Sequence, residues 1–144
     1  MRPYQSSDDA QWLRMRCALW PDESPEELAS EQEAWAAGDE TAAFFAVEED
    51  GSLIGFAEVS IHTDAPGCTS NRIGFLEGWY VDPAHRRQGV GRALNAAAEQ
   101  WARERGCTEM ASDTNESYPY SPAAHRSLGY TQIPNSWDFY KQLL

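Results

Sequence analysis

The sequence is poor in cysteine, in histidine and in positive charge, and it has no long hydrophobic run. Three cysteines, Cys17, Cys68 and Cys107, form no C-x-x-C pair, which excludes a zinc ribbon or a dithiol site and predicts reduced thiols. Three histidines lack the spacing of metal ligands, so we expect no metal. No apolar segment approaches the ~20 residues of a membrane span, and the first residues lack the apolar centre of a signal peptide. We therefore expect a cytoplasmic protein with no membrane partner.

The shortage of positive charge limits the possible partners. The 144 residues contain 23 acidic and 11 basic side chains, which give a formal charge of −12. This balance argues against binding a nucleic acid and favours a cationic partner, although acidity that only maintains solubility explains it equally well. Hydrophobic residues make up 42 % of the chain, enough to enclose one core, so we predict a single domain over residues 1–144.

Periodicity and end signals predict four helices. The second has the clearest start, because Ser24 can cap it and Pro25 occupies its first position. The third is the longest, rich in alanine, leucine, glutamate and arginine, and closes at Gly106. The predicted ranges are 9–20, 24–38, 89–106 and 121–129.

Between these helices, alternating apolar and β-branched residues predict strands. A hairpin covers residues 42–62 around a turn at 49–51, and "IGFLEGWYV" at 73–81 is typical of a strand buried on both faces. Further strands are predicted at 107–112, 130–133 and 136–144. Helices and strands in this order indicate an α/β domain with a mixed sheet.

One Gly-rich turn follows the buried strand. The stretch "HRRQGVGRAL" at 85–94 places R-x-x-G-x-G before a helix, where backbone N–H groups and the helix dipole favour an anion. It lacks the lysine of a P-loop and the third glycine of a dinucleotide fingerprint. The turn is therefore predicted to bind phosphate through the N–H groups at the helix start, without either of these motifs. The alternative is an ordinary surface turn.

The surrounding residues narrow this choice. The stretch "FLEGWYVDPAHRRQGVGRAL" resembles the acyl-coenzyme A motif of the GNAT acetyltransferase superfamily, and "GCTEMASDT" with "HRSLGYTQ" resembles the second half of that fold. The strings "LWP", "FLEG" and "MASDT" resemble bacterial aminoglycoside 6'-N-acetyltransferases. The resemblance implies an α/β GNAT fold, with a mixed, mostly antiparallel central sheet splayed at the acetyl-coenzyme A site and about four flanking helices. It implies acetyl transfer to the 6'-amino group of an aminoglycoside, hence antibiotic resistance, in a ternary complex.

The resemblance also assigns residues to acetyl-coenzyme A, the expected cosubstrate. The turn would bind its pyrophosphate, and main-chain groups of the preceding strand would bind the pantetheine arm. The amide of Trp79 would lie near the thioester carbonyl as an oxyanion donor. Tyr118 stands where relatives place an asparagine that touches the coenzyme. The full set is Trp79, Tyr80, Val81, Arg87, Gln88, Gly89, Val90, Gly91, Arg92 and Tyr118.

Two carboxylates are candidates for binding the acceptor amine and taking its proton. Glu77 precedes Trp79 by two residues, so both side chains lie on one face of the strand. The alternative for Glu77 is a buried partner of a core arginine. Asp113, at the end of the next strand, matches the family's acid that holds the amino groups of the drug, and its alternative is a cap of the following turn.

Four further positions are assigned by resemblance. Trp20 would line the substrate cleft, with helix-end packing as its alternative. Asp64 lies in the loop that faces the cleft in relatives. Asn135 falls near an acid of some relatives, which Asp138 could replace. His125 occupies the position of a tyrosine proposed as general acid, with solvation on a helix surface as its alternative; His62 and His85 are expected to be structural or exposed.

Other functions remain open at this stage. The acceptor could be a polyamine or a protein amine, and a non-catalytic coenzyme A-binding module is a further alternative. No cysteine or serine has the setting of a nucleophile, so no covalent enzyme intermediate is expected. The apolar stretch "SWDFYKQLL" predicts a homodimer formed through the C-terminal strands.

Overall fold

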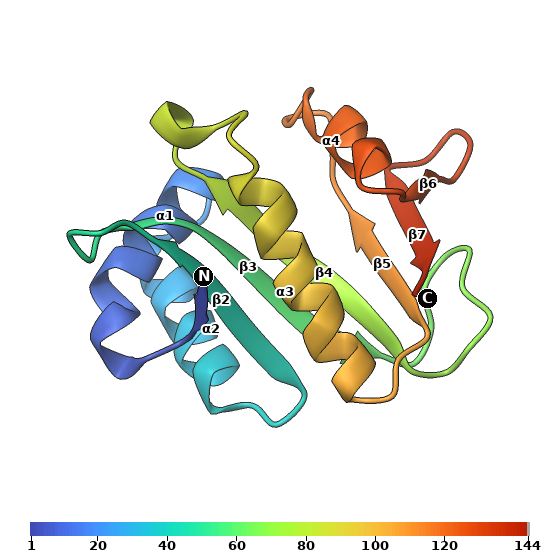
Figure 1. Cartoon of the computed structure of the whole chain (residues 1–144), viewed down its shortest axis with the longest axis horizontal. Coiled ribbons are helices and arrows are strands. Elements are labelled where there is room, and N and C mark those ends of the chain that lie inside the picture. The colour runs from blue at the N-terminus through green and yellow to red at the C-terminus, as the bar shows by residue number, and fades with distance from the viewer. Residues whose placement is uncertain (144) are drawn as a thin grey trace. The chain divides into compact units, whose positions relative to one another are not determined.

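The computed structural model describes residues 1–143, and its elements follow the predicted order (Figure 1). Those residues form four α-helices and a seven-stranded sheet of order β1-β2-β3-β4-β5-β7-β6, which confirms the predicted α/β class. No helix among them is long and apolar enough to cross a membrane. The elements are β1 (Arg2–Pro3), η1 (Ser6–Asp8), α1 (Asp9–Leu19), α2 (Pro25–Ala37), β2 (Thr41–Val47), β3 (Leu53–His62), β4 (Ile73–Val81), η2 (Pro83–His85), α3 (Val90–Glu104), β5 (Glu109–Asp113), α4 (Ser121–Ser127), β6 (Thr131–Gln132) and β7 (Asp138–Gln142).

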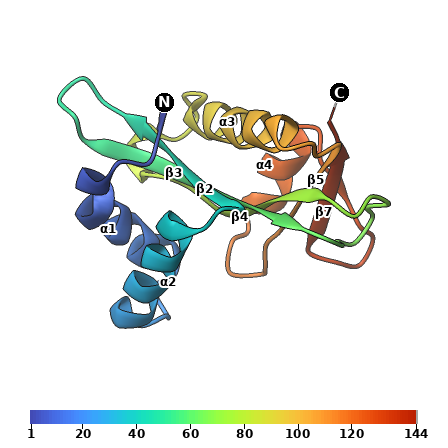
Figure 2. The same cartoon turned by 90° about the horizontal axis from the view of Figure 1, so that it is seen from below.

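The chain folds into two compact units. The first comprises Met1–Glu58 and Gly78–Ala98. Within it, α1 and α2 cover one face of β2 and β3, and the start of α3 lies over the other face (Figure 2). Trp12, Phe45 and Phe56 are fully buried between these elements. The Ser24 hydroxyl accepts a hydrogen bond from the Glu27 amide, as the predicted cap requires.

A buried ion pair crosses the first unit from α1 to β3. The Arg16 guanidinium donates to both carboxylate oxygens of Glu58, and both side chains are at most 3 % exposed. The indole Nε1 of Trp12 donates to Glu58 over 2.9 Å, and Arg16 also reaches Glu31 at 3.0 Å. Because a buried charge is costly unless it is paired and hydrogen-bonded, these contacts fix the register of α1 against the sheet.

The second unit comprises Val59–Glu77 and Glu99–Leu144. Its strands β4 and β5 run parallel, and their register extends from the pair Ile73–Glu109 to the pair Leu76–Ser112. Strand β4 continues to Val81, whereas β5 ends at Asp113. The ladder therefore opens after four residue pairs, which agrees with the predicted splay of the sheet. On its other side β5 pairs antiparallel with β7.

Glu109 anchors the loop between β3 and β4. Its carboxylate accepts hydrogen bonds from the Ser70 hydroxyl and from the amides of Ser70 and Thr69, and Gln142 donates a further one. Burial alone would raise the pKa of Glu109, but these hydrogen bonds outweigh burial and lower the pKa to about 2. The carboxylate thus holds one end of the loop that contains Asp64.

Replacing Glu109 by glutamine is expected to destabilise the fold by about 1–3 kcal/mol near pH 7, because the charge and one of the two acceptor oxygens are replaced by a neutral NH2 donor. In the wild type this contribution is complete above pH 4.5, the ordinary pKa, and is lost as the pH falls toward about 2. Denaturant unfolding at several pH values checks both statements. A wild-type advantage over Glu109→Gln that does not shrink with falling pH would contradict them.

Candidate active site

Trp79 fixes the start of α3 in the first unit. Its indole Nε1 donates to the carbonyl of Gly91 over 2.8 Å, and its ring lies against the same residue. A Cβ atom on Gly91 would come within 3.3 Å of that ring. Packing against Trp79 therefore favours glycine at position 91, and the close approach of a ligand to its main chain remains a prediction. The side chain of Trp79 positions the turn, and its amide remains the predicted oxyanion donor.

Left-handed residues shape the turn itself. Arg87 has φ = 64° and Gly89 has φ = 83°. No heavy atom lies within 4 Å of a Cβ built on Gly89, so a side chain would meet no steric obstacle there. The left-handed backbone conformation is what favours glycine at this position. The turn leads directly into α3, whose first N–H groups have no acceptor within the helix and, with the helix dipole, favour an anion. These features fit a pyrophosphate at the start of α3.

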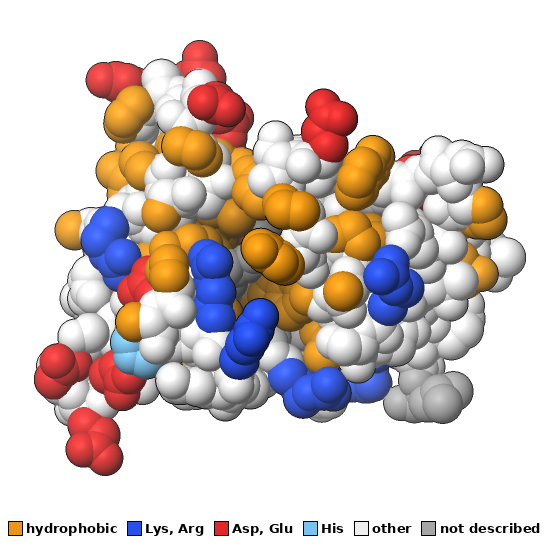
Figure 3. Space-filling view, turned by 90° about the horizontal axis from the view of Figure 1, so that it is seen from above, with side chains coloured by type: hydrophobic (Ala, Val, Ile, Leu, Met, Phe, Trp, Pro, Cys, Tyr) orange, Lys and Arg blue, Asp and Glu red, His pale blue; other side chains and the backbone are white. Residues whose placement is uncertain are grey.

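Basic side chains surround this turn. Arg86, Arg87 and Arg92 are exposed, and Figure 3 shows basic side chains beside hydrophobic surface on the face viewed from the end where β4 leads into α3. Arg86 is engaged with β4: its Nε donates to the carbonyl of Val81 over 2.8 Å, and its guanidinium lies 5.8 Å from the centre of the Tyr80 ring. The expected contact of Val81 with the coenzyme therefore requires Arg86 to share this carbonyl.

Glu77 lies in the second unit, on β4. Its side chain is 33 % exposed, and one oxygen, Oε2, receives both of its contacts: the Ser60 hydroxyl at 2.8 Å and Nε2 of His62 at 3.0 Å. Within residues 1–143 no protein group hydrogen-bonds to Oε1. The alternative of a core arginine partner is wrong for Glu77, since Glu58 has that role. An accessible carboxylate with one open oxygen can receive a cationic amine.

Asp113 ends β5 opposite Asp138 of β7, so two carboxylates face one another across this pair of strands. Partial burial raises the pKa of Asp113, and the negative charges of Glu77 and Asp138 raise it further, against an opposing effect of His62. The predicted cap alternative is not observed, because Asn115 and not Asp113 accepts from the Ser117 amide. A bound cation would relieve the repulsion among these acids.

His125 is buried, which rules out the predicted alternative of a solvated helix surface. It is 2 % exposed and stacks on Phe139 with ring centres 4.4 Å apart. Nδ1 lies 2.8 Å from the Ser121 carbonyl, and Nε2 lies 2.9 Å from the Ser112 hydroxyl, which itself lies 3.0 Å from the Leu76 carbonyl. A neutral ring with its hydrogen on Nε2 donates to the Ser112 hydroxyl, and its Nδ1 can accept from the Ser121 hydroxyl at 3.2 Å. A protonated ring donates from both nitrogens, to the Ser112 hydroxyl and to the Ser121 carbonyl.

Burial lowers the pKa of His125, although the Ser121 carbonyl opposes this effect. The neutral ring is therefore favoured near pH 7, and the charged ring, which donates from both nitrogens, forms only at lower pH. A role as general acid remains a prediction, with the consequence that its contribution grows as the pH falls.

The remaining predicted residues occupy varied surroundings. Trp20 follows α1, with its ring 4.8 Å from the Arg16 guanidinium and packed near Gly78, so the predicted helix-end packing is present. Asp64 and Asn135 are exposed in loops, and Asn135 has φ = 58°, which asparagine tolerates. Tyr118 lies before α4 and is half-buried. Their substrate and coenzyme contacts remain predictions.

Sequence reasoning missed Ser60 and His62 as neighbours of Glu77. Both lie on one face of β3 two residues apart, but the loop from 63 to 72 hides the register between β3 and β4. Ser112 was missed because a short buried serine gives no periodic signal. Within residues 1–143 no three His, Cys, Asp or Glu side chains are grouped as metal ligands. The three cysteines are free thiols.

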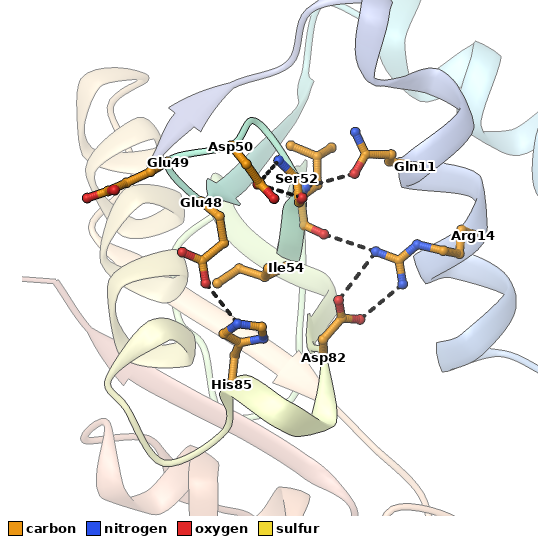
Figure 4. A pocket seen from close by; sticks show the side chains of 10 residues that line it. Gln11, Arg14, Glu48, Glu49, Asp50, Ser52, Ile54, Asp82 and His85 are labelled. Carbon is orange, nitrogen blue, oxygen red and sulfur yellow. Dashed lines mark hydrogen bonds and ion pairs between the residues drawn. The ribbon is translucent and has the colours of Figure 1, made fainter.

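A separate pocket of about 700 Å³ lies in the first unit, between α1, the β2–β3 turn and η2 (Figure 4). Its walls are tied together by Arg14 with Asp82 at 3.2 Å and by His85 with Glu48 at 2.8 Å. None of its lining residues is a predicted site residue. The pocket is therefore lined by ion pairs and lies outside the site predicted for acetyl transfer.

Strand β4 extends beyond its parallel neighbour β5 and is followed by a glycine-rich turn and the helix α3. This arrangement is typical of acyl-coenzyme A-dependent acetyltransferases. The chain belongs to the acetyltransferase (GNAT) family, whose model matches residues 8–130. Both the predicted fold and the predicted family are thereby confirmed.

Two curated relatives are called aminoglycoside N(6')-acetyltransferase type 1. The one from Klebsiella aerogenes is 48 % identical, over 99 % of this chain and 96 % of that protein. The one from Stenotrophomonas maltophilia is 42 % identical, over 92 % and 86 %. The solved structure of aminoglycoside N-acetyltransferase AAC(6')-Iy in complex with CoA matches with a TM-score of 0.87 at 35 % identity, over 93 % of this chain and 88 % of that one. AAC(6')-Iy with the bisubstrate analogue CoA-S-monomethyl-acetylneamine matches with a TM-score of 0.85 at 36 % identity, over 91 % and 89 %.

If His125 donates a proton, the variant His125→Gln is expected to lower kcat by roughly 10²-fold and to remove a rise in rate toward low pH. The cause is loss of the only titrating group in the series of hydrogen bonds from Ser121 to Leu76. The rate of thiol release, measured between about pH 5 and pH 8, provides the check. An unchanged kcat together with a lower melting temperature would assign His125 a purely structural role.

Proposed function

We propose that the protein is an acetyl-coenzyme A-dependent aminoglycoside 6'-N-acetyltransferase that confers antibiotic resistance. The observation that carries this proposal is Glu77, whose open carboxylate oxygen lies on β4 two residues before Trp79. One strand thus presents a group for the amine and a main-chain donor for the thioester carbonyl. The names of the relatives supply the acceptor class.

The donor end holds acetyl-coenzyme A. The turn from Arg87 to Arg92 binds the pyrophosphate through its N–H groups and its guanidinium groups. Beyond Leu76 β4 is not paired with β5, so its main chain from Trp79 to Val81 binds the pantetheine arm. No metal takes part in this arrangement.

The acceptor end holds a polycation. Glu77, Asp113 and Asp138 present carboxylates, and a net charge of −12 steers a cationic drug toward the protein. Trp20, Asp64 and Asn135 complete the proposed acceptor contacts. The raised pKa of Asp113 makes this residue a stronger base than an ordinary aspartate, which suits a second proton acceptor.

Transfer proceeds directly, without a covalent enzyme intermediate. Glu77 takes a proton from the 6'-ammonium group, directly or through water, and the neutral amine then attacks the thioester carbonyl. The Trp79 amide stabilises the oxyanion that forms. As the C–S bond breaks and the amide C–N bond is completed, the nitrogen loses its second proton, for which Asp113 is the proposed acceptor. The protonated form of His125 gives a proton to the departing thiolate and regains one from solvent, into which both carboxylates release theirs. The products are the N-acetylated drug, coenzyme A and one released proton.

The variant Glu77→Gln is expected to lower kcat by about 10²-fold or more on an aminoglycoside with a 6'-amino group, because the amine loses its proton acceptor. Thiol release from acetyl-coenzyme A measures this rate. The 6'-amino drug is compared with an aminoglycoside that has a 6'-hydroxyl and with spermidine.

Turnover of the 6'-amino drug alone, lost in Glu77→Gln, supports both the acceptor and the site. Turnover of spermidine alone would move the protein to the polyamine acetyltransferases. Calorimetric binding of coenzyme A with no turnover of any amine would indicate a non-catalytic binding module.

We also propose that the protein forms a homodimer in the cytoplasm, where acetyl-coenzyme A is available. Strand β7 lies between β5 and β6 in the sheet, so the proposed contact shifts from β7 to the edge strand β6 and the neighbouring Trp137, which is 44 % exposed. Sedimentation is expected to give twice the monomer mass of 16.1 kDa. A single monomeric species at micromolar concentration would contradict the dimer.

A further inference from the structure

The carboxylate of Glu77 is held asymmetrically. Ser60 and His62 both contact Oε2, at 2.8 Å and 3.0 Å, while Oε1 has no protein partner within residues 1–143. A carboxylate oxygen only accepts hydrogen bonds, so the Ser60 hydroxyl donates and Nε2 of His62 carries a hydrogen. Two donors on one oxygen fix the rotation of the group and determine where the other oxygen points.

The His62 ring is itself held in place. His62 ends β3, and its ring stacks on Phe75 with centres 4.3 Å apart and planes inclined by 16°. Phe75 is 8 % exposed and precedes Glu77 by two residues on β4, so it lies on the same face of the strand. A buried aromatic ring thus supports the imidazole beside the carboxylate.

His62 also lies within the electrostatic field of the acceptor acids. Its charge acts on Asp113 in opposition to the charges of Glu77 and Asp138. Its side chain is 35 % exposed, so solvent and a ligand can reach the group that it contacts. His62 is therefore placed between a buried support and the carboxylate that receives the amine.

We propose that His62 is a positioning residue for the acceptor amine: with Ser60 it holds Oε2 of Glu77 so that Oε1 is presented to the cationic 6'-amino group. This inference rests on the proposed function and names a residue on which acceptor binding and proton removal depend. His62 acts through Glu77 and donates no proton to the products. Its contribution is the hydrogen on Nε2 and the stacked position of the ring.

Two substitutions separate the hydrogen bond from the stacking. His62→Phe keeps an aromatic ring on Phe75 and removes the donor, whereas His62→Gln places an amide N–H near the position of Nε2 and removes the ring. His85→Phe is the matched control, because His85 also contacts a glutamate, Glu48, at 2.8 Å, but lies outside the acceptor acids. Melting temperatures establish that each variant of the full chain folds.

Steady-state thiol release is measured in two series. In the first the concentration of a 6'-amino aminoglycoside is varied, and in the second the concentration of acetyl-coenzyme A is varied. His62→Phe is expected to lower kcat/KM for the drug by about 10–100-fold, since a small misplacement of a reacting group has an effect of this size. The KM for acetyl-coenzyme A is expected to stay unchanged. His62→Gln is expected to recover most of the loss, and His85→Phe to leave the KM for the drug unchanged.

Equal activity of His62→Phe and wild type would overturn the inference and leave the proposed function intact. A His62→Gln variant as impaired as His62→Phe would also overturn it, because the ring and not the donor would then be required. If folded wild-type protein turns over no 6'-amino drug, the proposed function fails, and the inference fails with it.

Discussion

The end of the hydrogen-bond ladder between β4 and β5 is the constraint on which the functional geometry depends. The last pair joins Leu76 to Ser112, and the Ser112 hydroxyl lies 3.0 Å from the Leu76 carbonyl. Because β4 continues to Val81, its later main-chain groups are not used by β5. A fully paired β4 would satisfy these groups internally and leave none for the proposed pantetheine contacts. The same strand alternates its side chains, so Glu77 and Trp79 are presented from one face.

Three glutamates have the same carboxylate group but different roles, because their burial and their hydrogen-bond partners differ. Glu58 is fully buried against Arg16 and Trp12 and aligns α1 with the sheet. Glu109 collects backbone amides and the Ser70 hydroxyl, which holds a loop. Glu77 is partly exposed and leaves one oxygen open. Burial and the number of donors, not residue type, decide which carboxylate has an oxygen available to a ligand.

The two glycines of the turn also differ in their physical requirement. Gly89 adopts a left-handed conformation in open space, whereas Gly91 meets the Trp79 ring. The motif R-x-x-G-x-G therefore combines a backbone requirement with a packing requirement. The packing requirement at Gly91 couples the turn to β4 through Trp79, so the turn and this end of the strand are positioned together in the first unit.

The sequence by itself determined the elements, the α/β class, the glycine-rich turn before α3 and the family, because periodicity, capping residues and glycine positions are local in the chain. It also selected Glu77 and Asp113, since their strand positions follow from the strand ends. Tertiary structure alone decided which arginine pairs with which glutamate, that His125 is buried, and that His62 and Ser60 reach Glu77. These contacts join residues separated by long loops, and strand register across such loops is set by packing of the whole sheet and not by local sequence.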